Sequence, residues 1–124
     1  MKRTILAVLL VLISITALAD DLVSVGSVTQ SGQTYELFVI PSSIQQTSKN
    51  HVKMWTELYE DSSIKFKTRY EYNCSELESK QLYLIVHAPD GHIIMQGDPH
   101  NNWIPVSPHS LDYATIKYAC ANRK

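Results

Sequence analysis

Hydrophobic and polar residues alternate regularly over residues 63–74, which read SIKFKTRYEYNC. From Ile64 to Cys74 every second residue is apolar, aromatic or small, and the residues between them are charged or polar. Because successive side chains of a strand point to opposite faces, this pattern predicts a β-strand with one buried face and one solvated face. We expect the other elements to be organised around this strand.

Five further strands are expected, at 22–29, 34–40, 51–60, 80–88 and 92–96. Gly26 in the first of them is a candidate β-bulge. Short links, including the turn sequence Pro89-Asp90-Gly91, predict three antiparallel hairpins. We expect residues 41–50 to form a polar surface link. Residues 97–109 contain three prolines and are expected to hold no regular structure.

Residues 111–121 carry apolar side chains at helical spacing, with Leu111, Ala114 and Tyr118 along one stripe. Ser107 and Pro108 are the expected N-cap and first helical residue. The predicted class is therefore α+β, a sheet of about six antiparallel strands with one C-terminal helix packed on it.

The first nineteen residues have the features of a secretory signal. A basic start precedes an apolar run over 5–15, and Ala17-Leu18-Ala19 is followed by Asp20. Because the run is too short for a membrane span, we expect cleavage between Ala19 and Asp20, with an uncleaved anchor as the alternative. A lipoprotein would carry a cysteine where Asp20 stands, so we expect a periplasmic or secreted protein that is not lipid-anchored.

Residues 20–124 suit a single domain without a membrane span. The full chain has a net charge of −1, and removal of Lys2 and Arg3 with the signal makes the remainder more acidic. An acidic balance gives no electrostatic reason to expect nucleic acid or an anionic membrane surface as a partner.

Cys74 and Cys120 are the two cysteines of the chain. In a small exported protein they are expected to form a disulfide, which would tie the C-terminal helix to the organising strand. Two free thiols are the alternative. A zinc site is disfavoured because neither cysteine has a C-x-x-C partner.

Catalytic motifs are missing from the sequence, including a phosphate-binding glycine loop, G-x-S-x-G and H-E-x-x-H. We therefore expect a protein that is not an enzyme and needs no cofactor. His87 and His92 flank the turn that contains Asp90, so these three residues are candidates for a Zn²⁺ or Cu²⁺ site in a metal or small-ligand carrier. Ordinary solvated loop histidines are the competing explanation.

Large aromatic residues occur on the faces of strands expected to be solvated. Trp55, Tyr59 and Tyr83 are candidates for an interface with another protein, because exposed aromatics are enriched at interfaces. The alternative is that a helix or loop covers them. Trp103, in the proline-rich segment, is expected either to pin that segment to the core or to serve as an exposed binding aromatic.

Several short motifs occur in a fixed order and together cover most of residues 34–121. They are Pro41-Ser42-Ser43-Ile44, V-K-M-W at Trp55, Y-x-Y-x-C at Cys74, Gly91, W-x-x-V-x-P-x-S from Trp103 to Ser110, and Y-A-C at Cys120. In these motifs and their order the chain resembles the surface-adhesin protein E family, a family of exported bacterial proteins.

The resemblance implies an antiparallel sheet with a C-terminal helix and a disulfide between Cys74 and Cys120, and it allows a homodimer. It also implies adhesion to host matrix or serum proteins such as vitronectin and laminin. The residues themselves favour a non-enzymatic envelope protein that acts through protein–protein contacts.

Overall fold

The computed structural model describes residues 21–99 and 102–123. The expected signal segment 1–19 and its cleavage site between Ala19 and Asp20 lie outside these residues. Within the described ranges, no helix has the length and apolar character needed to cross a membrane.

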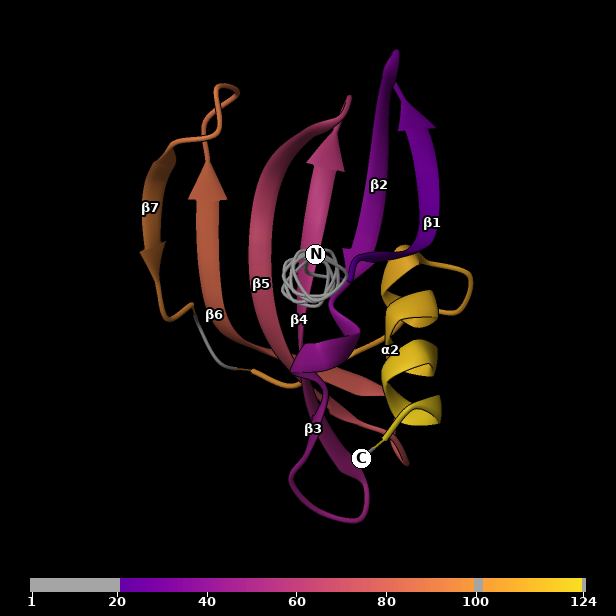
Figure 1. Ribbon diagram of the computed structural model, residues 1–124. Helices are drawn as coiled ribbons and strands as arrows, with labels where there is room; N and C mark the ends of the chain where they lie inside the picture. Colours follow the sequence, from indigo (N-terminus) through magenta and orange to yellow (C-terminus); the bar gives the residue numbers. More distant parts are fainter. Residues whose placement is uncertain (1–20, 100–101, 124) are drawn as a thin grey trace, which may run out of the picture.

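One antiparallel sheet contains all the main strands, in the order β1-β2-β4-β5-β6-β7 (Figure 1). Each strand pairs with the next along the chain, as the expected hairpins require. The strands are β1 Val23–Gln30, β2 Gln33–Val39, β4 His51–Glu60, β5 Ser63–Asn73, β6 Glu78–His87 and β7 Ile93–Gly97. The predicted class and strand order are therefore confirmed, with boundaries shifted by one or two residues for all strands except β4.

Three short elements lie in the segments expected to be links. Pro41–Ser43 forms the 3-10 turn η1, Gln45–Gln46 forms β3, and Ile104–Pro105 forms β8. β3 pairs with the part of β4 that β2 does not reach, and β8 pairs with the first residues of β6. The expectation that residues 97–109 hold no regular structure is thus wrong at β8, because a free sheet edge satisfies backbone groups that would otherwise need water.

The C-terminal helix α2 spans Leu111–Ala121, as predicted. Its N-cap is Ser110, whose Oγ accepts a hydrogen bond of 3.1 Å from the backbone N–H of Tyr113. The prediction of Ser107 as the N-cap is wrong. His109 has φ of 67°, a left-handed conformation that interrupts any helix beginning at Ser107.

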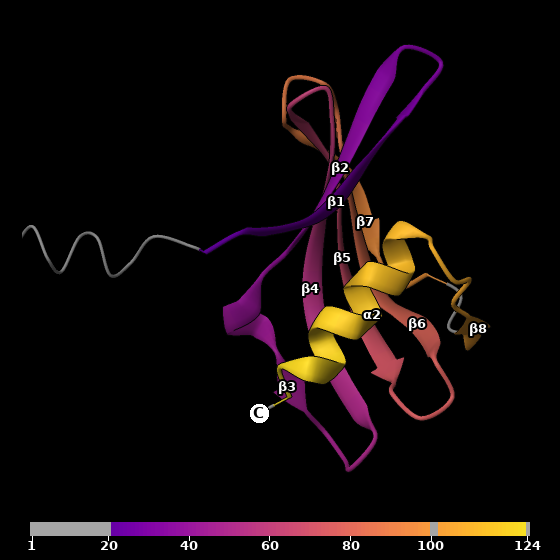
Figure 2. The same ribbon diagram turned by 90° about the vertical axis from the view of Figure 1, so that its right-hand side faces the viewer.

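Helix α2 packs on one side of the sheet, which we call the inner face; the opposite side is the outer face (Figure 2). Ile116 of the helix is fully buried against the inner face. The most deeply buried members of this core are Val39, Val52, Met54, Tyr72, Ile116 and Ala119. Gly26 in β1 makes the predicted bulge, and a side chain there would meet Leu111 Cδ2 at 3.0 Å.

The predicted disulfide is present and lies against this core, with the Cα atoms of Cys74 and Cys120 5.8 Å apart. Cys74 follows β5 directly, and Cys120 lies in the last turn of α2, at a sequence separation of 46. The helix is therefore held to the sheet by a covalent bond at its C-terminal end and by packing along its length.

Tyr72 is 1% exposed, and its hydroxyl has no hydrogen-bond partner among the described residues. Since a buried unsatisfied hydroxyl costs about 1–3 kcal/mol, Tyr72→Phe is expected to raise the free energy of unfolding by about 1 kcal/mol. Burial also raises the pKa of Tyr72 well above 10. As the pH rises above about 10, Tyr72 therefore loses its hydroxyl proton in the unfolded state before it does so in the folded state. The free energy of unfolding falls through that range.

Urea unfolding at neutral and alkaline pH tests this prediction. Tyr72→Phe should remain more stable than the native protein at neutral pH and lose less stability above about pH 10. Tyr83→Phe, whose ring lies on the outer face, is the matched control. A loss of stability at neutral pH in Tyr72→Phe would show that the hydroxyl contributes a favourable contact.

Candidate protein interface

Aromatic and basic side chains from three adjacent strands meet on the outer face. Trp55 of β4, Arg69 of β5 and Tyr83 of β6 occupy one cross-strand row. The Trp55 and Tyr83 rings pack edge to face with centroids 6.2 Å apart, and Lys67 Nζ lies 5.7 Å from the Trp55 ring. All four side chains are half-buried. Such a group can contact a partner with little loss of side-chain entropy, because its members already restrain one another.

Arg69 lies between these two aromatic residues in the row. Its Nη2 donates a hydrogen bond of 3.3 Å to Gln45 Oε1, which links the row to β3. Its Nε is buried without a partner among the described residues. The guanidinium therefore keeps donor capacity, and arginine is one of the residues that contribute most at interfaces.

Tyr59 lies farther along β4 and packs edge to face against Phe38 of β2, with centroids 5.1 Å apart. Its hydroxyl donates a hydrogen bond of 2.8 Å to Glu57, whose carboxylate lies 3.7 Å from Lys67 Nζ. Burial, followed by the bond to Glu57, raises the pKa of Tyr59 to about 12. Tyr59 is therefore neutral at physiological pH and stays a hydrogen-bond donor.

Trp103 extends the same face toward β8. Its ring packs edge to face with His51 at 5.4 Å, and Lys80 Nζ lies 5.4 Å from its centroid. His51 Nδ1 is 2.8 Å from Glu71 Oε2. Trp103 is half-buried and thus pins the proline-rich segment to the fold, as one of the two expectations required, but it does so on the outer face of the sheet and not in the core.

Of the three residues proposed for metal binding, Asp90 and His92 contact each other, and His87 contacts a backbone group. His92 Nδ1 contacts Asp90 Oδ1 at 2.5 Å, whereas His87 Nδ1 lies 3.0 Å from the carbonyl oxygen of Gly91. In the described part of the chain, no three histidine, cysteine, aspartate or glutamate side chains are grouped closely enough to hold a metal ion. The turn therefore uses its polar groups to stabilise itself.

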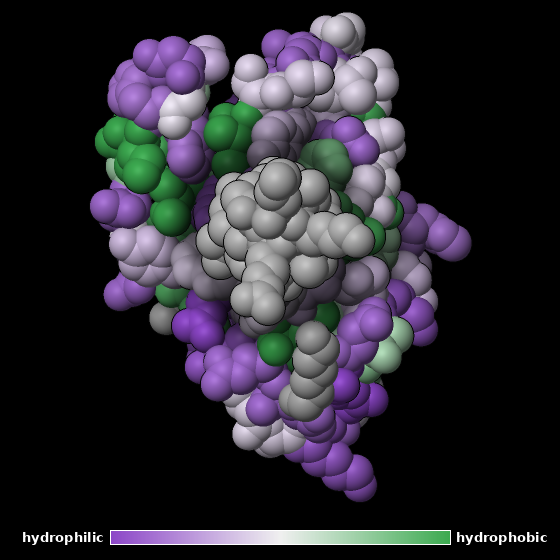
Figure 3. Space-filling view, viewed as in Figure 1, coloured by the Kyte–Doolittle hydropathy of each residue, from purple (hydrophilic) through white to green (hydrophobic). Residues whose placement is uncertain are grey.

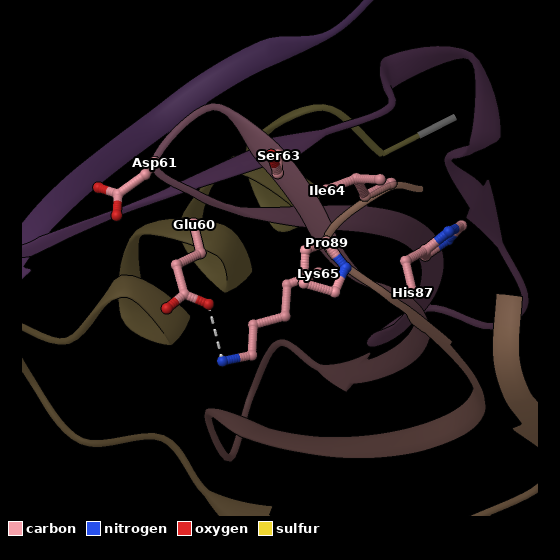
Figure 4. Close-up of a pocket in the computed structure, with 7 residues that line it drawn as sticks. All are labelled: Glu60, Asp61, Ser63, Ile64, Lys65, His87 and Pro89. Carbon is pink, nitrogen blue, oxygen red and sulfur yellow. Dashed lines mark hydrogen bonds and ion pairs between the residues drawn. The ribbon is translucent and has the colours of Figure 1, made fainter. Parts of the chain in front are cut away.

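A pocket of about 380 Å³ lies beside this turn, between the β4–β5 and β6–β7 connections (Figure 4). Lys65 Nζ reaches Glu60 Oε2 at 2.9 Å on one side, and His87 lies on the other. Among the described residues no hydrogen bond or ion pair joins His87 to Glu60 or Asp61. The pocket is therefore lined by the Lys65–Glu60 ion pair and by His87, which do not interact with each other.

Strand β7 forms the other end of the sheet and is unusually apolar for an edge. Ile93, Ile94 and Met95 are 49%, 59% and 60% exposed. They form the apolar area over β7 at the left of the space-filling view (Figure 3). Edge strands of this kind tend to acquire a partner, because their backbone groups and side chains are both available.

Of the predicted interface residues, the structure joins Trp55 to Tyr83 and places Tyr59 in a neighbouring aromatic pair. Sequence reasoning missed one participant on the same face, Phe38, and named Trp103 without assigning it to a face. Phe38 could have been found from its alternation with the buried residues Leu37 and Val39 in β2. Trp103 lies in a segment without periodicity, so its face could not be derived.

Comparison with known proteins adds to this geometry. The profile of the family described as surface-adhesin protein E matches residues 23–121, which include every strand and the helix. Searches of curated proteins and of solved structures each found no match. Because the match spans most of the chain, the protein belongs to the surface-adhesin protein E family.

Proposed function

We propose that this chain is an exported, non-enzymatic envelope protein that acts by contacting another protein through the outer face of its sheet. The observation that carries the proposal is the half-buried group formed by Trp55, Arg69 and Tyr83 on the side away from α2. Tryptophan, tyrosine and arginine dominate the energetics of protein interfaces. The family match supports an adhesin-like role.

The alternation of β4 explains why this group is available. Val52, Met54 and Thr56 are buried on the inner face. Because successive side chains of a strand point to opposite faces, Trp55 points outward. Helix α2 contacts β1, β4 and β5 from the inner side only. The aromatic residues are therefore not needed to fill the core that α2 completes.

Site-specific photo-crosslinking in cells tests the proposal. A benzophenone side chain in place of Tyr83 is expected to give a discrete adduct with a second protein. The matched control places the same group at Phe66, a half-buried aromatic on the inner face. Adducts from position 66 and none from position 83 would contradict the proposal.

A host-matrix adhesin is the second candidate, favoured by family membership alone. Vitronectin and laminin are the natural probes. Absence of saturable binding to either protein at micromolar concentration would remove this candidate and leave a partner in the bacterial envelope. Both candidate functions, a contact with an envelope protein and adhesion to a host protein, use the outer face of the sheet. The crosslinking experiment therefore tests the surface for either function.

A further inference from the structure

Helix α2 covers only part of the inner face. Its eleven residues are about 16 Å long, whereas the ten residues of β4 extend about 33 Å. Ile116 and Ala119 pack on Val52 and Met54, near the beginning of β4. Figure 2 shows the β1–β2 hairpin extending well beyond the first turn of the helix. The inner face at that end of the sheet therefore needs another cover or faces solvent.

The uncovered part of the inner face has an apolar row across it. The register aligns one residue from each strand in the order Leu37, Leu58, Phe66, Val86 and Met95. At about 4.8 Å per strand the row is roughly 19 Å long. Its first member is 8% exposed and its last is 60% exposed, so the row opens toward the β7 edge.

A cavity of about 290 Å³ lies between this row and the first turn of α2. Leu58, Phe66 and Leu84 supply apolar walls, and Leu111 of the helix closes one side. Thr56 and Thr68 lie on its floor, where the Thr56 hydroxyl donates to the Thr68 carbonyl oxygen at 3.3 Å. The floor hydroxyl of Thr56 is thus already satisfied.

The end of the cavity next to the helix is polar. Tyr70, Gln81 and Asp112 line it, and the amide of Gln81 donates to the Tyr70 hydroxyl at 3.4 Å. Asp112 makes no ion pair or hydrogen bond within the described residues. It lies exposed at the mouth, yet desolvation by the surrounding protein raises its pKa. Burial raises the pKa of the Tyr70 and Tyr72 hydroxyls, and the charge of Asp112 adds to this shift in both.

We propose that this cavity binds a small amphipathic amine, with its apolar body on Leu58, Phe66 and Leu84 and its ammonium group at Asp112. Charge complementarity selects the ligand class, because an unpaired carboxylate beside apolar walls is best satisfied by a cation that carries its own apolar surface. At about 30 Å³ for each non-hydrogen atom, the cavity holds a body of about ten such atoms. This site is on the face opposite the proposed protein interface, so either one can fail without the other.

Calorimetric titration with octylamine, octanol and octanoate tests the proposal, because these probes share an alkyl chain and differ in the charge of the head group. Octylamine is expected to bind with one-to-one stoichiometry, octanol about tenfold more weakly, and octanoate not measurably. Methyl NMR signals of Leu58 and Leu84 should shift on titration. Equal affinity for octylamine and octanol, or shifts elsewhere only, would overturn the proposal.

Variants separate charge recognition from simple apolar binding. Asp112→Asn should lower octylamine affinity about tenfold and leave octanol affinity unchanged, and Glu57→Gln, an acid-to-amide change on the outer face, should alter neither. Unchanged octylamine binding in Asp112→Asn would contradict the assignment. If a second copy of the chain occupied the cavity, the methyl signals would shift with protein concentration and the mass would be that of a dimer, both without octylamine. That result would also overturn the proposal.

Discussion

The variant Cys74→Ala/Cys120→Ala is expected to lose about 4 kcal/mol of unfolding free energy. The bond closes a loop over a sequence separation of 46 residues. Without it the unfolded chain gains conformational entropy, which lowers the free energy of the unfolded state by this amount at 25 °C. A domain of this size has about 5–15 kcal/mol in total. The change therefore removes a large share of the stability of the fold.

Urea unfolding of the oxidised protein, the reduced protein and the double alanine variant measures this effect. Reduced protein and variant should agree with each other, because both lack the same loop closure. The slope of unfolding free energy against urea should rise, because the unfolded chain without the bond is more expanded and exposes more surface. A loss below about 1 kcal/mol in the variant would mean that the helix needs no covalent tie.

Ile116→Ala is expected to cost about 3 kcal/mol, within the range for buried aliphatic residues truncated to alanine. Ile116 is fully buried between α2 and the inner face, where it packs with Val52 and Met54. Truncation leaves a cavity that the sheet cannot close, because the disulfide holds the helix in place. The free energy of unfolding measured in urea gives the loss.

Ile104→Ala is the matched control for this prediction. Ile104 is the same residue type but is 59% exposed in β8, so its truncation should change stability by less than about 0.5 kcal/mol. Similar losses in the two variants would show that α2 does not complete the core. A large loss in Ile116→Ala alone supports the packing described for the inner face.

The sheet was predictable from sequence where alternation continues over many residues. The sequences of strand β5 and its neighbour β4 each alternate over ten residues or more, so the period-2 pattern determined both their existence and their faces. Helix α2 was predictable from its apolar stripe. The pairing of Cys74 with Cys120 was expected because the chain has no other cysteine.

Short elements and covered surfaces were not predictable in this way. β3 and β8 are two residues each, too short for any period, and they form because a neighbouring edge is free. The N-cap at Ser110 depends on the left-handed conformation of His109, which composition does not indicate. The uncovered part of the inner face depends on the length of α2 relative to β4, a relation that appears only when both are placed in three dimensions.

The proposed interface was predictable only in part. Trp55 and Tyr83 were assigned to outward-facing positions by alternation alone, but their contact across Arg69 depends on the register of three strands. A bulge between Arg69 and Tyr70 sets that register. The sequence pattern of each strand taken alone contains no information about such a bulge.

The central claim is that the outer face of the sheet is the protein-binding surface. The yield of the adduct formed by a benzophenone group at position 83, compared in cells between the otherwise native protein, Trp55→Ala and Phe66→Ala, tests it most directly, because it requires no identified partner. Trp55→Ala should lower the yield about tenfold or more, as expected for an interface tryptophan, and Phe66→Ala should leave it unchanged. Equal losses in both variants, or a loss in Phe66→Ala alone, would contradict the claim.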